Sequence, residues 1–350
     1  LPINLILLNI FVLIKSIILF LKNYLYKIFY NGKKIQINPS SILLVSNLIR
    51  TIDLKNKDDF YFANFQKICN KNEKNICYRL LINHTKESSE RLNYILSKNK
   101  ISNTYVLPKY LNIYNELSLF INLIPSYLHL NKIKKKISNK IFKQIITRTN
   151  ISLFDKQTRF NLRISKQLIK LLEIINPQKI ICAFEGFGHE RLIFFEARKF
   201  NKNISCFGYQ HAPVTKINHA IKRSFNKLYD PDQIFLTNKV FMSEFTNSKK
   251  TLNIKKTVIG NLKYSKIILN KKNSLKPRCL ILPEGFSSET NMLFNLGIDS
   301  ARSANNIEFI FRSNPYLRFK TKKQVPKNFH FSNYDKLTSD LKYADFILYR

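Results

Sequence analysis

The stretch "KIICAFEGFGHER", residues 179–191, decides how the chain folds. Its first part is a short apolar run typical of a buried strand, and it ends at Glu185. Gly186 and Gly188 then permit a tight turn, and a helical pattern begins near His189. A strand, a turn and a helix in direct succession are typical of parallel α/β proteins, which place their chemistry at the carboxyl ends of the strands.

The same alternation extends along the chain on both sides of this stretch. A lysine-rich helical part at about 110–150 interrupts it and is expected to be an excursion from the sheet. We therefore predict a mostly parallel sheet with helices on both faces. The predicted strands are 41–46, 75–82, 103–108, 179–185, 204–210 and 233–237, and the predicted helices are 59–71, 88–98, 157–175 and 188–200.

A second series of strands and helices begins at "RCLILPEG" (278–285). It predicts strands at 307–315, 328–332 and 345–349 and helices at 288–303 and near 335–343. The preceding polar stretch reads as a linker that contains Lys271, Lys272, Asn273, Ser274 and Pro277. We predict Rossmann-like domains over 36–272 and 273–350, and we expect the second to be incomplete because domains usually have roughly 100–150 residues.

Residues 1–35 form a separate apolar and basic segment. Wound as a helix, residues 3–26 gather most of their polar side chains on one side. A helix crossing a bilayer would bury Lys15 near its middle, at a cost of roughly 2.5–3.5 kcal/mol. We predict a helix that lies in the membrane interface; a buried core helix is the alternative.

The ends of the sequence suggest a fragment. The first residue is Leu1 instead of Met, and "ADFILYR" stops on what looks like a completed strand. We expect the chain to be cut, possibly at both ends.

The charge of the chain is strongly positive, with 59 basic and 22 acidic residues and a formal net charge of +37. The lysines are spread along the whole length, and no nucleic-acid-binding motif accompanies them. We expect no nucleic-acid partner, and a surface that favours anionic membranes or phosphorylated ligands. The five cysteines lack CxxC spacing and are typical of reduced residues in a cytoplasmic protein.

Candidate catalytic residues follow the strands of the first domain. His211, in "SCFGYQHAPV" (205–214), could act as a general base, or it could be a hydrogen-bonded loop residue. Glu185 ends a buried strand, where an acidic residue usually needs a functional or hydrogen-bonding reason. Glu190 and Arg191 fit either a ligand site or a solvated first helical turn.

The second domain offers candidates for phosphate binding. Glu284 and Gly285 follow a strand, and Ser287 and Ser288 stand where the next helix starts, which suits a phosphate or an ordinary N-cap. Arg312 ends another strand and could hold a phosphate or be solvated. No metal-ligand motif and no GxSxG serine-hydrolase turn is present in the sequence.

Several of these stretches together resemble a known family. "FEGFGHERLIFFEARK", "ISCFGYQHAPV", "PDQIFLTN", "VIGNLKY", "ILPEGFSSE", "FIFRSNP" and "YADFILYR" occur in an order similar to bacterial surface-carbohydrate biosynthesis proteins, which are similar to GT-B glycosyltransferases of capsule and lipopolysaccharide assembly. The resemblance covers residues 180–350 well and implies two Rossmann-like domains facing a cleft. It implies no cofactor and no metal.

The resemblance also implies roles for the candidate residues. His211 and Glu185 would be catalytic, one of them as the base, with Tyr209, Gln210, Glu190 and Arg191 beside them on the acceptor side. A nucleotide-sugar donor would meet the second domain at Glu284, Gly285, Ser287, Ser288, Arg312, Tyr349 and Arg350.

Two departures from the family pattern affect the donor side. Relatives read Arg-x-His-Pro where this chain has Arg312, Ser313, Asn314 and Pro315. They also continue past "ADFILYR" with a Gly/Ser-rich loop and a helix that cradle the donor phosphates. We therefore expect the 350-residue chain by itself to be inactive.

The leading hypothesis is a metal-independent glycosyltransferase at the inner face of the plasma membrane. It would move a sugar from a nucleotide-activated donor to a surface-glycan or lipid-linked acceptor. The alternatives are a transferase of CDP-activated polyol phosphate and a non-catalytic, membrane-peripheral scaffold with the same fold.

Overall fold

The computed structural model describes most of the chain from residue 40 onward. The described residues are 40–51, 54, 58–71, 76–215, 220–246, 254–262, 276–314, 317, 319, 321, 323–333 and 337–349, with Ile14, Ile17, Ile18 and Leu21, which are helical. The rest of the predicted interface helix, the linker residues 271–274 and Arg350 lie outside them. The chain divides into two compact units, Leu1–Lys263 and Tyr264–Arg350, whereas the sequence predicted a boundary at 272.

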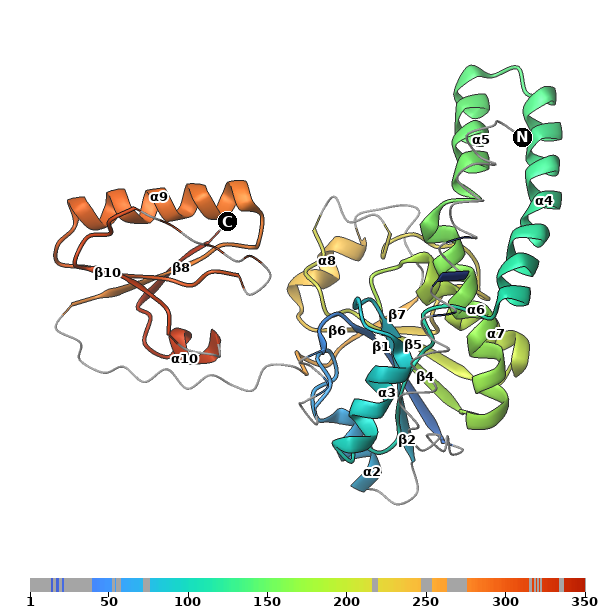
Figure 1. Cartoon of the computed structure of the whole chain (residues 1–350), viewed down its shortest axis with the longest axis horizontal. Helices are drawn as coiled ribbons and strands as arrows, with labels where there is room; N and C mark the ends of the chain where they lie inside the picture. The colour runs from blue at the N-terminus through green and yellow to red at the C-terminus, as the bar shows by residue number, and fades with distance from the viewer. Residues whose placement is uncertain are drawn as a thin grey trace. The chain divides into compact units, whose positions relative to one another are not determined.

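The first unit is built on a parallel sheet (Figure 1). Its strand order is β3-β2-β1-β4-β5-β6-β7, and every neighbouring pair is parallel. The central strands are almost wholly buried and rich in Ile, Leu and Cys, as strands covered on both faces must be. The strands are β1 (Ile42–Leu48), β2 (Cys77–Asn83), β3 (Thr104–Val106), β4 (Lys179–Ala183), β5 (Ser205–Tyr209), β6 (Gln233–Leu236) and β7 (Lys255–Val258).

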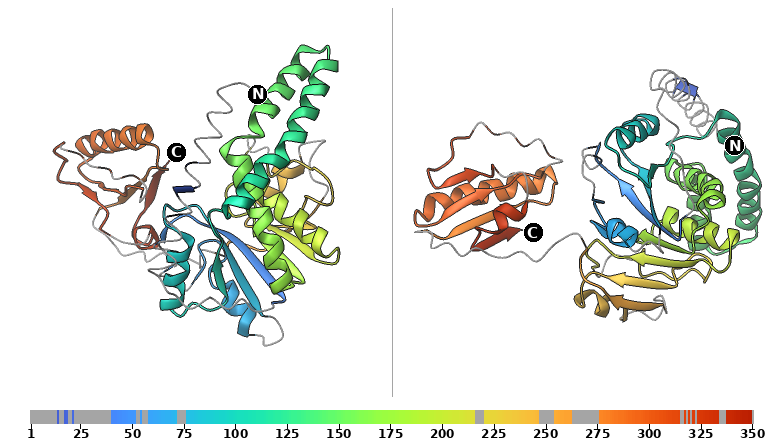
Figure 2. Two further views of the ribbon diagram at one scale, coloured as in Figure 1. Left: turned by 45° about the vertical axis from the view of Figure 1, so that its right-hand side comes forward. Right: turned by 90° about the horizontal axis from the view of Figure 1, so that it is seen from below.

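Helices cover both faces of this sheet (Figure 2). Leu168, Leu172 and Phe194 belong to the core on the face covered by α6 (Lys156–Ile175), α7 (Gly188–Phe200) and α8 (Val240–Thr246). Phe62 and Leu92 belong to the core clusters that α2 (Phe65–Lys71) and α3 (Ser89–Lys98) form with the sheet. The unit is therefore a three-layer α/β/α sandwich.

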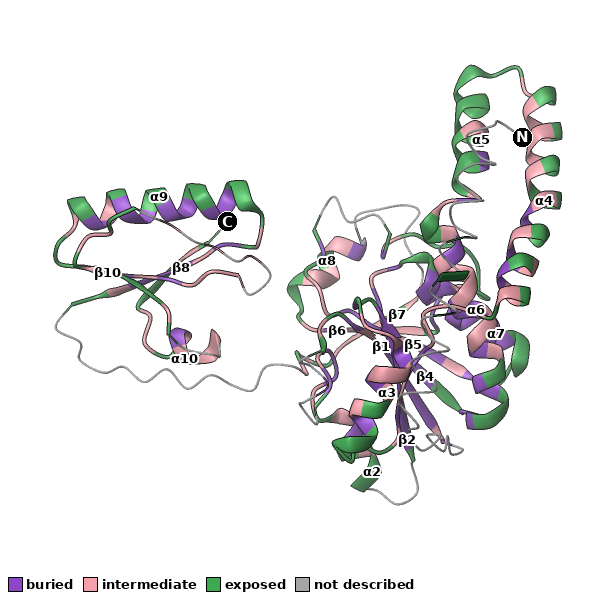
Figure 3. Cartoon of the chain, viewed as in Figure 1, coloured by how far each residue is buried: buried purple, intermediate pink, exposed green. Residues whose placement is uncertain are grey.

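Two helices of this unit extend beyond the layers. α4 (Ile113–Lys136) and α5 (Lys140–Ser152) lie side by side and project from the sandwich in both views (Figures 1 and 2). Most of their outer length is exposed or half-buried (Figure 3). This confirms the predicted helical excursion at about 110–150.

The second unit has a smaller parallel sheet of order β10-β9-β8-β11. Its core packs Phe294 of α9 against Phe311 and Phe329 of the sheet. A Cβ at Gly297 would lie 2.4 Å from Ile281 Cδ1, so this glycine lets α9 approach the sheet closely. The elements are β8 (Arg278–Leu282), α9 (Ser287–Ser303), β9 (Glu308–Phe311), β10 (Phe329–Phe331), α10 (Leu337–Leu341) and β11 (Phe346–Tyr349).

The predicted α/β fold with parallel sheets is confirmed, with local differences; the short helix α8, for example, was not predicted. The helix predicted from residue 59 begins only at Phe65, because the Asp59 carboxylate accepts the N–H groups of Tyr61 and Phe62 and holds a turn there. The strand β7 was not predicted, since "KKTV" is a polar, half-exposed edge strand with no apolar alternation.

Candidate active site

The strand order locates the expected site of the first unit. From β1 the chain proceeds outward to β2 and β3 on one side, and then through β4 to β7 on the other. Ligands of open parallel sheets bind outside the carboxyl ends of the strands at this reversal. Asn47 near the end of β1, His84 after β2, Glu185 after β4 and His211 after β5 all stand at this edge.

The two predicted catalytic residues lie in contact. His211 Nε2 is 2.8 Å from Glu185 Oε1, and their side chains are 14% and 34% exposed. The other ring nitrogen of His211, Nδ1, is buried and has no hydrogen-bond partner among the described residues. A proton on that nitrogen would be buried without an acceptor, so we assign the neutral ring that donates Nε2–H to Glu185.

A buried network holds the His211 ring from the other side. The Tyr61 ring packs edge-on against it, with 4.4 Å between centroids and 79° between planes. Tyr61 is held by Asp59, which accepts its N–H at 2.7 Å. Asp59 in turn accepts the Ser46 hydroxyl and lies 3.7 Å from Arg79 on β2. Sequence reasoning missed this network, because its members come from separate strands and loops.

Glu190 has a different place from the one expected. It is buried, and its Oε2 accepts the N–H groups of Glu185, Gly186 and Phe187 at 2.9, 2.7 and 2.9 Å. Burial raises the pKa of Glu190 to about 8, against the opposing effect of these hydrogen bonds. The side chain is therefore neither solvated nor turned to an acceptor; it accepts the N–H groups of the turn that leads into α7.

Arg191 is likewise a buried structural residue instead of an acceptor-side one. Its guanidinium pairs with Asp230 and donates to the carbonyl oxygens of Gly186, Ala220 and Arg223 at 3.2, 2.9 and 2.7 Å. These bonds tie the turn after β4 to the loop that precedes β6.

Tyr209 and Gln210, also expected on the acceptor side, are buried as well. The Tyr209 hydroxyl accepts the N–H of Leu262 at 3.0 Å. Gln210 accepts the N–H and hydroxyl of Thr237, both at 3.0 Å, and donates to Ala212. They fix the loop that carries His211, so their part in the site is to position it.

Two histidines at the same edge were missed as site residues. His189, in the first turn of α7, is 4% exposed, and neither ring nitrogen has a partner among the described residues. Burial lowers its pKa to about 4, so the ring is neutral at pH 7. His84 lies 6.3 Å from it between ring centroids and contacts Asn47 Oδ1 at 3.0 Å. The position of His84 directly after β2 was a sequence signal for it.

The second unit repeats the turn of the first. "EGFGHE" (185–190) and "EGFSSE" (284–289) each join a strand to a helix, with the phenylalanine as the helix N-cap. The glycine has a positive φ in both, 84° at Gly186 and 117° at Gly285. Glu289 is buried and accepts the N–H of Glu284 at 3.2 Å, in the manner of Glu190.

The correspondence extends to the neighbouring strand. The last paired residues are Ala183 with Tyr209 in the first unit and Ile281 with Phe311 in the second. If each strand pairing is extended beyond its last pair, Glu185 falls opposite His211 and Glu284 falls opposite Asn314. Asn314 Nδ2 donates to the Glu284 carbonyl oxygen at 2.7 Å. Asn314 therefore stands where the first unit has its histidine.

Some of the donor-side candidates are exposed, whereas Arg312 is bound to other side chains of the protein. Ser287 and Ser288 are exposed at the start of α9, and neither is the N-cap that the sequence offered as an alternative. Tyr349 is 71% exposed at the end of β11. Arg312 is neither solvated nor open to a bidentate phosphate contact, because its Nη1 binds buried Asp340 and the Ser332 hydroxyl.

The described part of the chain shows neither a metal cluster nor a membrane span. No group of three or more His, Cys, Asp or Glu side chains there could hold a metal ion. None of the helices described is long and apolar enough to cross a membrane.

Sequence comparison finds no relatives: no family model matches the chain, and no curated protein matches it significantly. Solved structures do match. The glycotransferase of kitacinnamycin aligns with a TM-score of 0.50 and 9% identity over 90% of this chain and 76% of that one. The UDP-GlcNAc 2-epimerase from Neisseria meningitidis bound to UDP-GlcNAc gives 0.49 and 12% over 88% and 77%. The calicheamicin glycosyltransferase gives 0.48 and 9% over 88% and 74%.

The first of these similarities defines a fold class. The chain has the α/β, parallel-sheet fold of the kitacinnamycin glycotransferase, which is the GT-B-like class that the sequence predicted. At 9% identity the likeness concerns the fold alone, so the activity has to be argued from the residues of this chain.

Proposed function

We propose that the protein is a glycosyltransferase that moves a sugar from a nucleotide-activated donor to a hydroxyl group of a surface-glycan or lipid-linked acceptor. The observation that carries the proposal is the Glu185–His211 pair at the carboxyl edge of the sheet, in a chain with the fold of a glycosyltransferase. Sugar transfer needs a base that takes the proton of the acceptor hydroxyl as its oxygen bonds to the sugar and the nucleotide phosphate leaves.

Within this pair we assign the base to Glu185 and a positioning role to His211. The Glu185 side chain is the more exposed of the two, whereas His211 Nδ1 is buried. The neutral His211 ring donates its Nε2–H to one carboxylate oxygen and fixes the direction of the carboxylate. The Tyr61 ring keeps the imidazole in place.

The second unit supplies the features that suit the donor. Ser287 and Ser288 are exposed in the first turn of α9, where the positive end of the helix favours a diphosphate. In the first unit the turn that leads into the equivalent helix is less suited to a phosphate, because Glu190 already takes three of its N–H groups, whereas Glu289 accepts the N–H of Glu284 in the second unit. The strongly basic chain is compatible with work at the cytoplasmic face of an anionic membrane.

A donor screen tests the proposal. The full-length protein is incubated with UDP-, GDP-, CMP- and dTDP-activated sugars and with CDP-glycerol, and release of each nucleotide is measured, with Glu185→Gln as the matched control. We expect turnover of one nucleotide sugar by the unaltered protein and its loss in the variant. Turnover of CDP-glycerol instead would identify a polyol-phosphate transferase, and no turnover of any donor would support a scaffold.

A further inference from the structure

The hairpin of α4 and α5 carries positive charge over the part nearest the loop that joins the two helices. Residues 117–154 contain no Asp or Glu. The same span carries seven basic residues, which are Lys132, Lys134, Lys135, Lys136, Lys140, Lys143 and Arg148. All of them except half-buried Lys134 are exposed. An uncompensated positive surface of this kind attracts polyanions.

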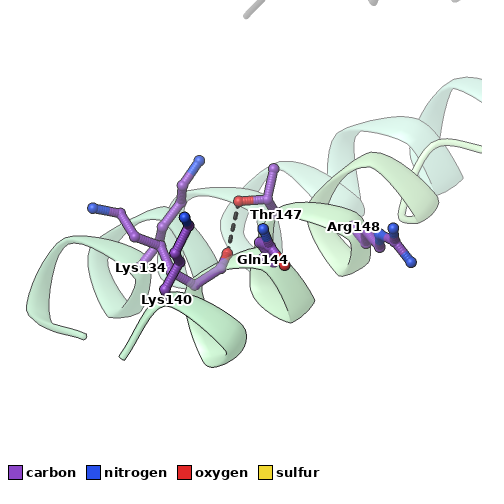
Figure 4. Close-up of a pocket in the computed structure, with 6 residues that line it drawn as sticks. Lys134, Lys140, Gln144, Thr147 and Arg148 are labelled. Atoms are coloured by element: carbon purple, nitrogen blue, oxygen red, sulfur yellow. Dashed lines mark hydrogen bonds between the residues drawn. The ribbon is translucent and has the colours of Figure 1, made fainter. Parts of the chain in front are cut away.

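The end of the hairpin gathers part of this charge around one hollow. Lys134 from α4 and Lys140, Lys143 and Arg148 from α5 line it, with Gln144 and Thr147 between them. Figure 4 shows these side chains, with the lysines at one end of the group and Arg148 further along its helix. The Thr147 hydroxyl is occupied by the carbonyl oxygen of Lys143 at 2.8 Å, so the cationic ends are the groups offered to a ligand.

Apolar side chains stand beside these cations. Ile141, Phe142 and Ile145 are 68%, 59% and 52% exposed. At 100° per residue they fall within one 100° arc of α5, and Lys140 and Lys143 lie outside it. A helix with an exposed apolar arc beside lysines is typical of segments that lie in a lipid–water interface.

Hydrogen bonds and ring contacts hold the base of the hairpin against the rest of the first unit. Glu116 near the start of α4 accepts two hydrogen bonds from Arg163 of α6, at 2.6 and 2.8 Å. Phe154, after α5, is buried against the rings of Phe120 and Tyr127 of α4. The outer ends of both helices are therefore held away from the sheet.

We propose that the end of the α4–α5 hairpin docks on an anionic lipid bilayer. The cations bind the lipid phosphates, and Ile141, Phe142 and Ile145 enter the boundary between headgroups and acyl chains. A nucleic acid would satisfy the cations but leave the isoleucine side chains in water, so the lipid surface matches both observations. This docking is independent of the Glu185–His211 chemistry, and it adds a second contact to the one predicted for the N-terminal segment.

Vesicle binding by charge-reversed variants tests the docking. The hairpin variant is Lys134→Glu/Lys140→Glu/Lys143→Glu/Arg148→Glu, and the control reverses four exposed lysines elsewhere in the first unit, Lys71, Lys98, Lys199 and Lys202, giving the same net charge. With vesicles that contain phosphatidylglycerol we expect the hairpin variant to lose at least tenfold in partitioning and the control about twofold or less. Equal losses in both would overturn the proposal, because general charge would then explain binding. The N-terminal segment is the same in both proteins, so its contribution cancels.

A fluorescence measurement tests insertion separately. The chain contains no tryptophan, so Phe142→Trp introduces a single reporter at the hairpin, and Phe200→Trp serves as the control. We expect phosphatidylglycerol vesicles to shift the emission of the first variant to the blue and brominated lipids to quench it, with neither change in the second. An unchanged emission spectrum of the Phe142→Trp variant on sedimented vesicles would overturn the proposal. Binding of single-stranded RNA is measured with the charge-reversed hairpin variant as well. If this variant lost RNA binding but kept vesicle binding, the proposal would also be overturned.

Discussion

Glu185 Oε1 lies 2.8 Å from His211 Nε2, although the two residues follow different strands and are 26 positions apart in sequence. The contact exists because β4 and β5 are parallel neighbours whose register sets these two residues opposite each other. Both side chains are thus delivered to the same edge by the sheet itself, and each can be altered while the sheet is kept.

The roles assigned to this pair predict different losses. Glu185→Gln keeps the size of the side chain and removes the base, so kcat should fall by about 10²-fold or more, the usual contribution of a general base. His211→Asn keeps a donor near Glu185 and should lower kcat by about tenfold without moving KM to the same extent. Steady-state kinetics on both variants of the full-length protein measure this. If His211→Asn abolished turnover and Glu185→Gln did not, the two roles would be reversed.

Glu190 makes the stability of the protein depend on pH. Its pKa is about 8 in the folded protein and near 4.5 when unfolded, so between these values the folded state holds a proton that the unfolded state has lost. Its contribution is therefore complete below pH 4.5 and is lost as pH rises to 8, by up to about 1 kcal/mol per pH unit.

Comparison with Glu190→Gln, which cannot titrate, isolates this effect. The free energy of unfolding from urea titrations should decline relative to the variant over this window. A constant difference between the two proteins would mean that the three N–H groups keep the side chain ionised throughout.

The buried Arg191–Asp230 pair should matter for stability far more than an exposed pair does. Arg191→Ala leaves Asp230 buried without its cation and should cost about 3–5 kcal/mol of unfolding free energy. Arg302→Ala breaks the pair with Asp299, whose side chains are 64% and 70% exposed, and should change it by less than about 1 kcal/mol. Thermal and urea unfolding of both variants provide the check. Similar small losses in the two would return Arg191 to the candidates for ligand binding.

Alanine substitutions at Gly186 and Gly260 allow the cost of backbone strain to be separated from the cost of a steric clash. Both have a positive φ, of 84° and 87°, so alanine is strained by roughly 1–2 kcal/mol at either position. A Cβ at Gly186 would also lie 2.3 Å from the Ala220 carbonyl oxygen, whereas nothing lies within 4 Å of one at Gly260. Gly186→Ala should therefore destabilise the protein clearly more than Gly260→Ala in the same unfolding assay, and equal losses would show that the turn can move away from residue 220.

The sequence predicted the structure best where a pattern of residues has a single structural meaning. Short apolar runs between helical patterns indicated the parallel strands, and the residues directly after them included Glu185 and His211. The sequence was less informative about the direction in which a side chain points. Glu190 is the last residue of "EGFGHE" (185–190), and its side chain could point either to solvent or back into the turn before the helix. Only the folded backbone decides between these two directions. Tyr61 reaches the site through a buried Asp59–Arg79 contact that no local pattern announces.

The turn after β4 has one more consequence. The N-terminus of a helix behind a parallel strand ordinarily attracts an anion. Here the Glu190 carboxyl group fills that place and uses the N–H groups of residues 185–187. The first unit thus uses one of its own side chains to satisfy N–H groups that a bound ligand could otherwise take. Under the proposed function, a phosphate-bearing donor would consequently find more N–H groups already taken in the turn before α7 than in the turn before α9.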